Sequence, residues 1–345
     1  MSPRLRPACL ILPVMLAFVL LAGRSAATEK QDANAFDINR SLGDGVNMGN
    51  MLEAPREGEW GVTMEKDFFA KIAEAGFDSV RIPVRWDTHA DANAPYRIDP
   101  AFLKRVRWAV DNARRQKLAV VLNFHHHESI YKDPNAETPR FVALWKQVAE
   151  AFSDYDRSLV FELLNEPHGK LDAAKWNDVL AGALAVVRKS NPTRAVMVGP
   201  AGWNSPNQLD RLQLPADDHM LIVTFHYYSP FHFTHQGAEW VGKKANEWLG
   251  KKWADTAKQR KAIEEHFARV ATWGKKHRRP IYLGEFGAYG KADMESRVRW
   301  TRFVRTTAER HDMAWAYWEF GAGFGVYDRQ ANRWRKELLN ALLGR

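Results

Sequence analysis

The chain has 345 residues, of which 46% are hydrophobic and 26% are charged, a composition that is ordinary for a globular protein. Its formal net charge of +9 is spread along the chain in short runs such as KKHRR at 275–279, which argues against a nucleic-acid-binding surface. The only cysteine is Cys9, so neither a disulfide framework nor a thiolate metal site is expected.

The first 27 residues have the pattern of a cleaved secretory signal peptide. Arg4 and Arg6 precede the apolar run ACLILPVMLAFVLLAG, and the small residues Ser25 and Ala27 follow it. The apolar run is too short and interrupted for a clear membrane span, although a retained single-span anchor is the alternative. Removal of this segment takes away three arginines and no acidic residue, which lowers the formal charge from +9 to +6. We therefore expect one secreted domain at 28–345, periplasmic or extracellular, with no membrane association after cleavage.

Eight short buried strands are predicted after the signal. They are runs rich in β-branched and aromatic residues without polar alternation, as expected for parallel strands covered on both faces. The predicted strands are 45–50, 79–84, 119–125, 159–166, 194–200, 221–228, 281–287 and 314–320.

Amphipathic segments separate these strands. Apolar residues recur every three or four positions in 65–76, 101–116 and 295–310, and Gly76 marks the expected end of the first of these helices. Eight alternating strands and helices predict an α/β protein with a single-domain (β/α)8 TIM barrel. A doubly wound open sheet is the alternative, but no glycine-rich phosphate loop follows any predicted strand.

Polar side chains stand at the carboxyl ends of the predicted strands, where TIM barrels place their chemistry. These residues are Asn50, His125 with His126, Asn165 with Glu166, His226 with Tyr228, Glu285, and Trp318 with Glu319. Glu166 in LLNEP and Glu285 in YLGEFG are the prominent carboxylates, although each alone could be a helix-capping or charge-network residue. Because they lie three strands apart on a closed ring, both can point into one mouth.

A carboxylate pair separated by about 5–5.5 Å is the requirement for retaining glycoside hydrolysis. An ionised Glu285 would attack the anomeric carbon, and a protonated Glu166 would donate to the leaving oxygen. Arg81 could lower the pKa of Glu285 by pairing with it, or could be a structural ion pair, and Tyr228 could hydrogen-bond the same carboxylate. Asn165 could hold a sugar 2-hydroxyl. Glu166 should have a raised pKa because a second carboxylate is near.

Aromatic residues are abundant, and some could stack on the apolar faces of sugar rings. The chain has 14 tryptophans, and any one of them is more often a core residue than a sugar platform, with Trp318 at the end of the eighth strand as the exception. Those in predicted loops or strand ends are Trp60, Trp203, Trp240, Trp253 and Trp318. The long segment after the sixth strand, which includes SPFHFTHQGAEW, should lie over the active-site mouth.

The run of histidines at 125–127 raises the alternative of a metal-dependent hydrolase. A zinc site needs three or four converging ligands, whereas adjacent residues on a strand point to opposite faces. The strand ends also lack the His-x-His after the first strand and the strand-eight aspartate of many metal barrels. We expect no metal and no cofactor, and activity retained after EDTA dialysis would reject the metal hypothesis. A carbohydrate-binding protein without catalysis is a further alternative, which release of new reducing ends would exclude.

The chain resembles glycoside hydrolase family 5 over nearly all of 36–343, most closely the bacterial endo-β-1,4-glucanases, some of which also cleave mannans. The motifs that carry the resemblance are FDINRSLGDGVNMGNMLEAP, VRIPVRW, FHHHE, LLNEPHG, FHYYSPFHFTHQGAEW, PIYLGEFGAY and WAYWEFGAGFGVYD. NEP alone is moderately specific, but NEP followed by HYY and then GEFG is a much stronger signal.

The resemblance implies roles for individual residues. Glu166 corresponds to the general acid/base and Glu285 to the nucleophile. The residues around the sugar at the cleavage point correspond to Arg81, His125, Asn165, His226, Tyr228 and Trp318. Further substrate contacts correspond to Asn50, Glu53, His126, His235 and Trp240. His127 replaces a tyrosine that is frequent in close relatives, and its role stays open.

The resemblance also implies the reaction and its partners. It implies a secreted retaining endo-β-1,4-glucanase that acts on a β-linked polysaccharide or oligosaccharide. An endo-β-1,4-mannanase, or a broad glucan and glucomannan hydrolase with the same carboxylate pair, is the alternative. We expect a monomer that binds no nucleic acid.

Overall fold

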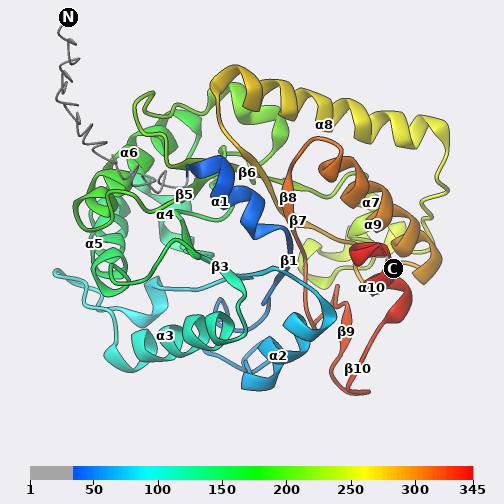
Figure 1. Ribbon diagram of the computed structural model, residues 1–345, viewed down its shortest axis with the longest axis horizontal. Helices are drawn as coiled ribbons and strands as arrows, with labels where there is room; N and C mark the ends of the chain where they lie inside the picture. Colours follow the sequence, from blue (N-terminus) through cyan, green and yellow to red (C-terminus); the bar gives the residue numbers. More distant parts are fainter. Residues whose placement is uncertain (1–33, 345) are drawn as a thin grey trace, which may run out of the picture. The chain divides into compact units, whose positions relative to one another are not determined.

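The computed structural model describes residues 34–344, so the predicted signal peptide lies outside the described residues. Eight parallel strands pair in chain order, and β8 pairs with β1 to close a barrel (Figure 1). The strands of the barrel are β1 (Asp44–Asn47), β2 (Ser79–Ile82), β3 (Ala119–Asn123), β4 (Leu159–Glu162), β5 (Val196–Val198), β6 (Leu221–Tyr227), β7 (Ile281–Phe286) and β8 (Ala314–Tyr317). The predicted (β/α)8 TIM barrel is therefore confirmed.

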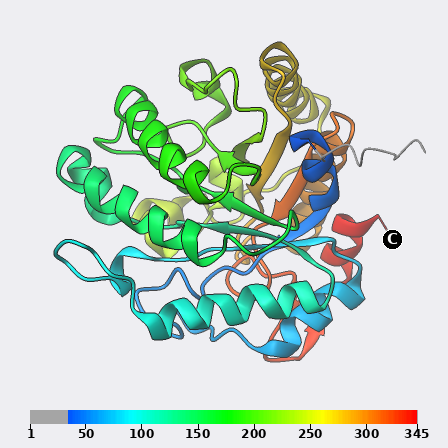
Figure 2. The ribbon, with the colours of Figure 1, turned by 60° about the vertical axis from the view of Figure 1, so that its left-hand side comes forward.

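Helices surround the outside of the barrel (Figure 2). The helices of residues 34–344, including α1 and α7 at the ends of the barrel, are α1 (Ala35–Leu42), α2 (Lys66–Ala75), α3 (Pro100–Arg115), α4 (Glu128–Lys132), α5 (Pro134–Ala151), α6 (Ala173–Ser190), α7 (Phe231–Thr234), α8 (Ala257–His277), α9 (Met294–Glu309) and α10 (Lys336–Leu343). Short 3-10 helices are η1 (Asp87–His89), η2 (Pro206–Arg211), η3 (Glu239–Val241) and η4 (Lys243–Trp248), and a small hairpin is formed by β9 (Tyr327–Asp328) and β10 (Arg333–Trp334). The predicted helices correspond to α2, α3 and α9. Gly76 ends α2 in the left-handed region at φ 96°, as expected.

The strand ladders end earlier than predicted, and several polar residues of the predicted strand ends lie just beyond them. β3 ends at Asn123, two residues before His125, and β4 ends at Glu162, four residues before Glu166. The His125 N–H donates to the carbonyl oxygen of Val84 at 2.8 Å, so hydrogen bonds between loops hold this segment after the ladder stops. Residues beyond the ladder need not alternate strictly between the two faces of the sheet. Consecutive residues can therefore face the same cleft.

Helix α1 packs against the barrel at the end where the strands begin. Its buried residues Ala35, Ile38 and Leu42 belong to one apolar cluster with residues near the starts of the strands, including Ala119 of β3 and Ala314 of β8. This cluster fills the amino-terminal end of the barrel with side chains. The end of the barrel that remains for ligand binding is therefore the carboxyl end.

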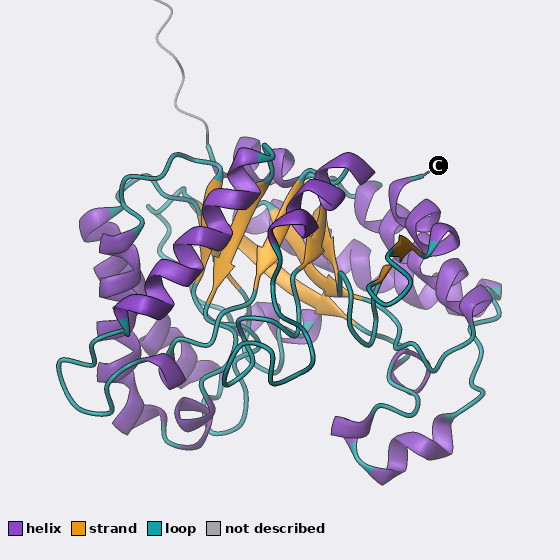
Figure 3. Cartoon of the chain, turned by 90° about the horizontal axis from the view of Figure 1, so that it is seen from below, coloured by secondary structure: helices purple, strands orange, loops and turns teal. Residues whose placement is uncertain are grey.

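The long connections gather at the end toward which the strands run (Figure 3). The segment between β6 and α8 contains α7, η3 and η4, as the predicted long loop requires. Gln236 is buried at its base, where the side-chain amide donates to the carbonyl oxygens of Phe233 at 3.0 Å and Lys251 at 2.8 Å. The Gly250 N–H donates back to the Gln236 side chain at 2.9 Å. One buried amide thus ties the two ends of this segment together.

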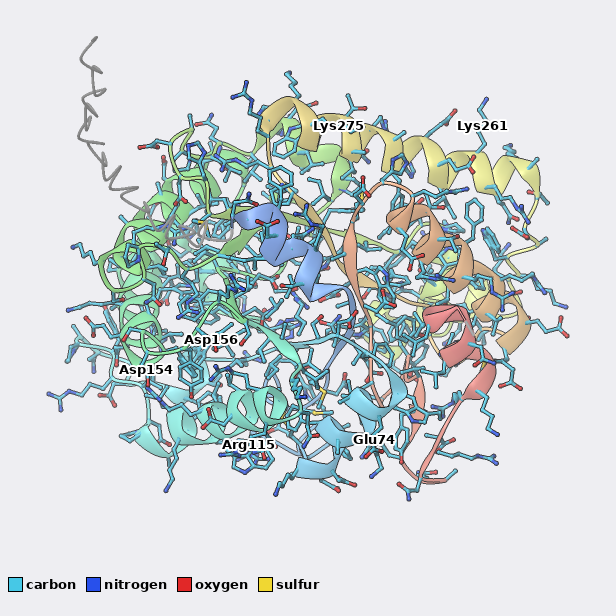
Figure 4. All side chains as sticks on the ribbon, in the orientation of Figure 1. Glu74, Arg115, Asp154, Asp156, Lys261 and Lys275 are labelled. Atoms are coloured by element: carbon cyan, nitrogen blue, oxygen red, sulfur yellow. The ribbon has the colours of Figure 1, made fainter. Side chains whose placement is uncertain are left out.

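The exposed charges carry both signs and are distributed over the outer helices and loops (Figure 4). Exposed examples labelled there are Glu74, Arg115, Asp154, Asp156, Lys261 and Lys275. The mixture of signs agrees with the modest net charge of the sequence. None of the helices within residues 34–344 has the length and hydropathy needed to span a bilayer.

Candidate active site

A cleft of about 950 Å³ opens at the carboxyl end of the barrel. The predicted site residues that line it are Asn50, Glu53, His125, His126, Asn165, Glu166, His226, Tyr228, His235, Trp240, Glu285 and Trp318. Arg81 is the exception, because it is fully buried inside the barrel beneath the cleft. The tertiary structure therefore brings the predicted residues together around one cavity.

The two prominent carboxylates face each other across His226. One oxygen of Glu166 and one of Glu285 lie within 4.8 Å of each other and of a ring nitrogen of His226. Glu285 belongs to β7, whereas Glu166 follows β4 with its backbone at φ 48°, in the left-handed region. A non-glycine residue in this region costs conformational energy and is found disproportionately at functional sites.

Glu285 is held by two donors from different strands. Arg81 Nη1 donates to Glu285 Oε1 at 2.7 Å, and the Tyr228 hydroxyl donates to Oε2 at 2.9 Å. Both contacts were predicted from the sequence. Burial nevertheless raises the pKa of Glu285 above its ordinary value, although His226, Arg81 and the Tyr228 hydrogen bond all act to lower it. The predicted lowering by Arg81 is therefore present but is outweighed by the removal of the carboxylate from water.

Burial likewise raises the pKa of Glu166, to about 7. The direction agrees with the prediction, but the cause differs. Loss of water at the cleft wall is the main contribution, and the negative charge of Glu162 adds a smaller one. At neutral pH a substantial fraction of Glu166 is consequently protonated, which is the form that can donate a proton.

His226 connects the two carboxylates. Its Nδ1 lies 2.7 Å from Glu166 Oε1 and 3.5 Å from Glu285 Oε2, while Nε2 lies 3.3 Å from the side-chain nitrogen of Asn204. Burial lowers the pKa of His226 to about 4, so the ring is neutral at neutral pH. Glycine is required at 284, because a Cβ there would lie 3.0 Å from the His226 ring and 2.5 Å from the hydroxyl of Thr224.

The three consecutive histidines lie in different surroundings. His125 and His126 both line the cleft, whereas His127 is fully buried and its Nε2 lies 3.1 Å from Glu137 Oε2. Within residues 34–344, the group with metal-site spacing is Glu166, His226 and Glu285, which includes none of these three histidines.

The surroundings of that group favour proton transfer over metal binding. The guanidinium of Arg81 contacts Glu285 directly, and a positive charge at 2.7 Å opposes the binding of a second cation. The remaining close contact, between His226 and Glu166, is a hydrogen bond of ordinary length at 2.7 Å.

The structure gives His127 a role in packing. Its ring stacks on Phe124 with centroids 5.1 Å apart and planes 6° apart, and burial lowers its pKa to about 4. We expect His127→Ala to destabilise the fold by about 1–3 kcal/mol, because a buried ring and its hydrogen bond to Glu137 are lost. Thermal unfolding and kcat/KM measured together test this: the melting temperature should fall while the activity of the folded fraction stays within about twofold. His126→Ala, which changes a residue that lines the cleft, is the comparison variant and should lower kcat/KM. A loss of more than about twofold in the activity of folded His127→Ala would contradict a packing role.

Aromatic side chains cover the walls of the cleft. Trp60, Trp203 and Trp240 line it and are exposed by 40%, 58% and 61%, respectively. Trp318 lies parallel to His125, with ring centroids 5.3 Å apart. Trp253 is fully buried and packs against Phe303, so its predicted availability as a sugar platform was wrong. A loop position does not imply exposure when the loop folds back onto a helix.

Some residues of the site were not identified from the sequence. Glu162 contacts Arg81, and Asn204 contacts His226, but neither is found at a predicted strand end that points into the cleft. Glu319 is fully buried and accepts hydrogen bonds from the backbone N–H groups of Gly321, Ala322 and Phe324, so it shapes the loop after β8 instead of lining the cleft. Unlike Glu162 and Asn204, Glu319 was named from the sequence among the strand-end residues with Trp318, and the structure corrects its expected position at the mouth.

Comparisons with known proteins agree with this geometry. Residues 38–323 match the family described as Cellulase (glycosyl hydrolase family 5). Endoglucanase H of Acetivibrio thermocellus is 38% identical over 314 residues, which cover 89% of this chain but 33% of that relative. The chain therefore spans about a third of the length of this curated relative.

Solved structures give matches that cover the whole of the other chain. Cel5A of Thermotoga maritima, described in complex with mannotriose and with cellobiose, is 49% identical with a TM-score of 0.88, covering 90% of this chain and 100% of that one. Cellulose synthase subunit Z of Clostridioides difficile is 38% identical with a TM-score of 0.84, covering 88% and 99%. Because residues 38–323 match this family, the prediction is confirmed, and the chain belongs to glycosyl hydrolase family 5.

Proposed function

We propose that the chain is a retaining endo-β-1,4-glucanase that cleaves internal linkages of β-glucans. The observation that carries this proposal is the approach of Glu166 and Glu285 to within 4.8 Å. Inverting enzymes keep their carboxyl groups about 6.5–9.5 Å apart to hold a water between them, whereas retaining enzymes need the shorter separation. We further propose that the catalytic domain comprises 28–345, that it is secreted after cleavage of 1–27, and that it acts as a monomer.

In the first step of the proposed reaction, ionised Glu285 attacks the anomeric carbon. Arg81 and Tyr228 hold this carboxylate so that one oxygen can face the sugar. Glu166 donates its proton to the glycosidic oxygen, and the aglycone leaves. In the second step Glu166 takes a proton from water, which attacks the same carbon and releases Glu285.

The remaining cleft residues would hold the sugar during both steps. Trp318 offers a flat face whose orientation is set by its stacking on His125. Asn165 lies beside Glu166 and would hydrogen-bond the 2-hydroxyl at the cleavage point. Further contacts would come from Asn50, Glu53, His126, His226, His235 and Trp240, which line the same cleft.

A mannan or glucomannan substrate is the second candidate. It is favoured by the similarity to Cel5A of Thermotoga maritima, which is described with both mannotriose and cellobiose. Initial rates on carboxymethyl-cellulose, barley β-glucan, glucomannan and galactomannan, measured side by side, distinguish the possibilities. Highest kcat/KM on a glucan supports the glucanase proposal, and highest kcat/KM on galactomannan rejects it in favour of a mannanase.

Retention of configuration is a direct consequence of the proposed mechanism. We expect proton NMR during the first minutes of hydrolysis to show the β-anomer of the new reducing end, because two displacements restore the original configuration. Running the reaction after dialysis against EDTA serves as the control for metal dependence, and the rate should not change. An initial α-anomer would mean inversion and would contradict the assignment of Glu285 as nucleophile.

A further inference from the structure

Glu162, the last residue of β4, carries a carboxylate inside the barrel that the proposed mechanism does not use. Its side chain is fully buried and accepts a two-pronged hydrogen bond from Arg81, with Nε to Oε2 at 2.6 Å and Nη2 to Oε1 at 2.8 Å. Two parallel bonds between a planar guanidinium and a carboxylate fix both position and orientation. Glu162 therefore determines where the remaining N–H groups of Arg81 point.

Each of the remaining N–H groups of Arg81 contacts a residue at the mouth of the barrel or just beneath it. Nη1 donates to Glu285 at 2.7 Å and to Asn47 Oδ1 at 2.8 Å, and Nη2 donates to Asn165 Oδ1 at 2.7 Å. All five donors of the guanidinium thus have an acceptor, and none is left to compensate for a rotation of the group. A displaced Glu162 would move the donors to both Glu285 and Asn165.

The charges of this cluster lead to a second consequence. Arg81 lies between two carboxylates, so Glu162 balances its positive charge and leaves the charge of an ionised Glu285 in excess. If Glu285 were the only partner, the same contact would neutralise the nucleophile. An uncompensated negative charge next to the anomeric carbon stabilises a transition state with oxocarbenium character.

We propose that Glu162 is a positioning residue for catalysis, which holds Arg81 and balances its charge so that Arg81 orients Glu285 without neutralising it. This inference rests on the proposed function, in which Glu285 is the nucleophile. Glu162 itself is too deeply buried to contact a sugar.

The experiment replaces Glu162 with glutamine, which keeps the shape but removes the charge and one of the two acceptors of the fork. The probe is 2,4-dinitrophenyl 2-deoxy-2-fluoro-β-cellobioside, whose leaving group needs no proton, so its rate of covalent labelling reports the nucleophile alone. The titratable or charged groups that face Glu285 are Arg81 from β2, His226 and Tyr228 from β6 and its end, and Glu166 and Glu162 from β4 and its end. All but Glu162 are unchanged in the variant.

We expect labelling of Glu162→Gln to be about 10- to 100-fold slower at its optimum, with the acid limb of its pH profile about one pH unit lower. The limb moves down because removal of a nearby negative charge favours ionisation of Glu285. Asp218→Asn is the matched control, because Asp218 accepts a similar fork from Arg188, at 2.7 and 3.1 Å, and lies just before the start of β6, at the end of the barrel opposite the cleft. It should lower the melting temperature and leave the acid limb in place.

The possible results separate the inference from the proposed function. An unlabelled wild type refutes the assignment of Glu285, whereas a labelled wild type with an unaffected Glu162→Gln refutes only the role of Glu162. A slower but unshifted Glu162→Gln refutes charge balancing. If Glu162→Gln does not fold, Glu162→Asp is the second test. Aspartate keeps the charge, but its shorter side chain displaces the two hydrogen bonds from Arg81. Labelling should then be slower, while the acid limb of the pH profile stays where it is in the wild type. A labelling rate equal to the wild type would overturn the inference.

Discussion

Replacing Glu285 with glutamine is expected to lower the hydrolysis of β-glucan on the order of 10⁴-fold or more, because an amide cannot attack the anomeric carbon. Glutamine has the shape of glutamate: its carbonyl oxygen can accept the hydrogen bond that Arg81 now donates to Glu285 Oε1 at 2.7 Å, and its amide nitrogen can donate to the Tyr228 hydroxyl, which now lies 2.9 Å from Oε2. The fold should therefore survive. The rate at which reducing ends are released from carboxymethyl-cellulose measures the effect, compared between the wild type and a variant with the same melting temperature.

Asp44 provides a control carboxylate in the same barrel. It begins β1, at the opposite end from the cleft, so Asp44→Asn should retain activity. A second measurement tests the chemistry of Glu285 itself. In Glu285→Ala, azide should restore cleavage of a dinitrophenyl cellobioside and give the α-glycosyl azide, because the small anion enters from the vacated side. Turnover by Glu285→Gln close to that of the wild type would refute the nucleophile assignment.

Replacing Glu166 with glutamine is expected to lower hydrolysis of polysaccharide by about 10²–10⁴-fold, the usual contribution of general acid catalysis. The loss should depend on the leaving group. A dinitrophenyl cellobioside leaves without a proton, so Glu166→Gln should release a burst of dinitrophenolate and then stall, because no base activates water for the second step. If Glu166→Gln lost as much activity on the dinitrophenyl cellobioside as on polysaccharide and released no burst, the assignment of Glu166 as the acid/base would be contradicted.

The pH dependence of the wild type follows from the same residue. Glu166 is active as an acid when protonated, and its pKa is raised to about 7, so kcat/KM on β-glucan should fall as the pH rises through 7. Glu285 is active when ionised, so activity should also fall on the acid side, at a pH above the ordinary value for a glutamate. His226 has a pKa of about 4 and does not account for the limb near 7. A basic limb that persists unchanged in Glu166→Gln would contradict this assignment.

The sequence was sufficient to predict the fold because the barrel is specified by local pattern. Buried apolar runs of strand length alternate eight times with segments of helical periodicity, which is the pattern of a closed parallel barrel, and the lack of a glycine-rich phosphate loop argued against a doubly wound sheet. The same regularity placed the polar strand ends, including Glu166 and Glu285, at one mouth. Their identity as a carboxylate pair needed only the topology.

Residues that act from inside the barrel were much harder to predict. Glu162 stands in LVFE, an apolar strand, and nothing near it in the sequence shows that Arg81 crosses the barrel to meet it. The role of Asn204 in the site likewise becomes apparent only from its contact with His226. These pairs are separated by 81 and 22 residues, and the contacts exist only once the barrel closes.

Burial was the other quantity that local sequence did not determine. Trp253 and Trp240 both belong to the long segment after β6, yet one is fully buried and the other is 61% exposed. The pKa of Glu285 is raised although Arg81 contacts it, because loss of water outweighs the attraction. Sequence alone thus determined the periodicity, the barrel and the residues at its mouth. The tertiary structure decided how far each of those groups is removed from water and which distant charges meet it, because both depend on packing between segments that are far apart in the chain.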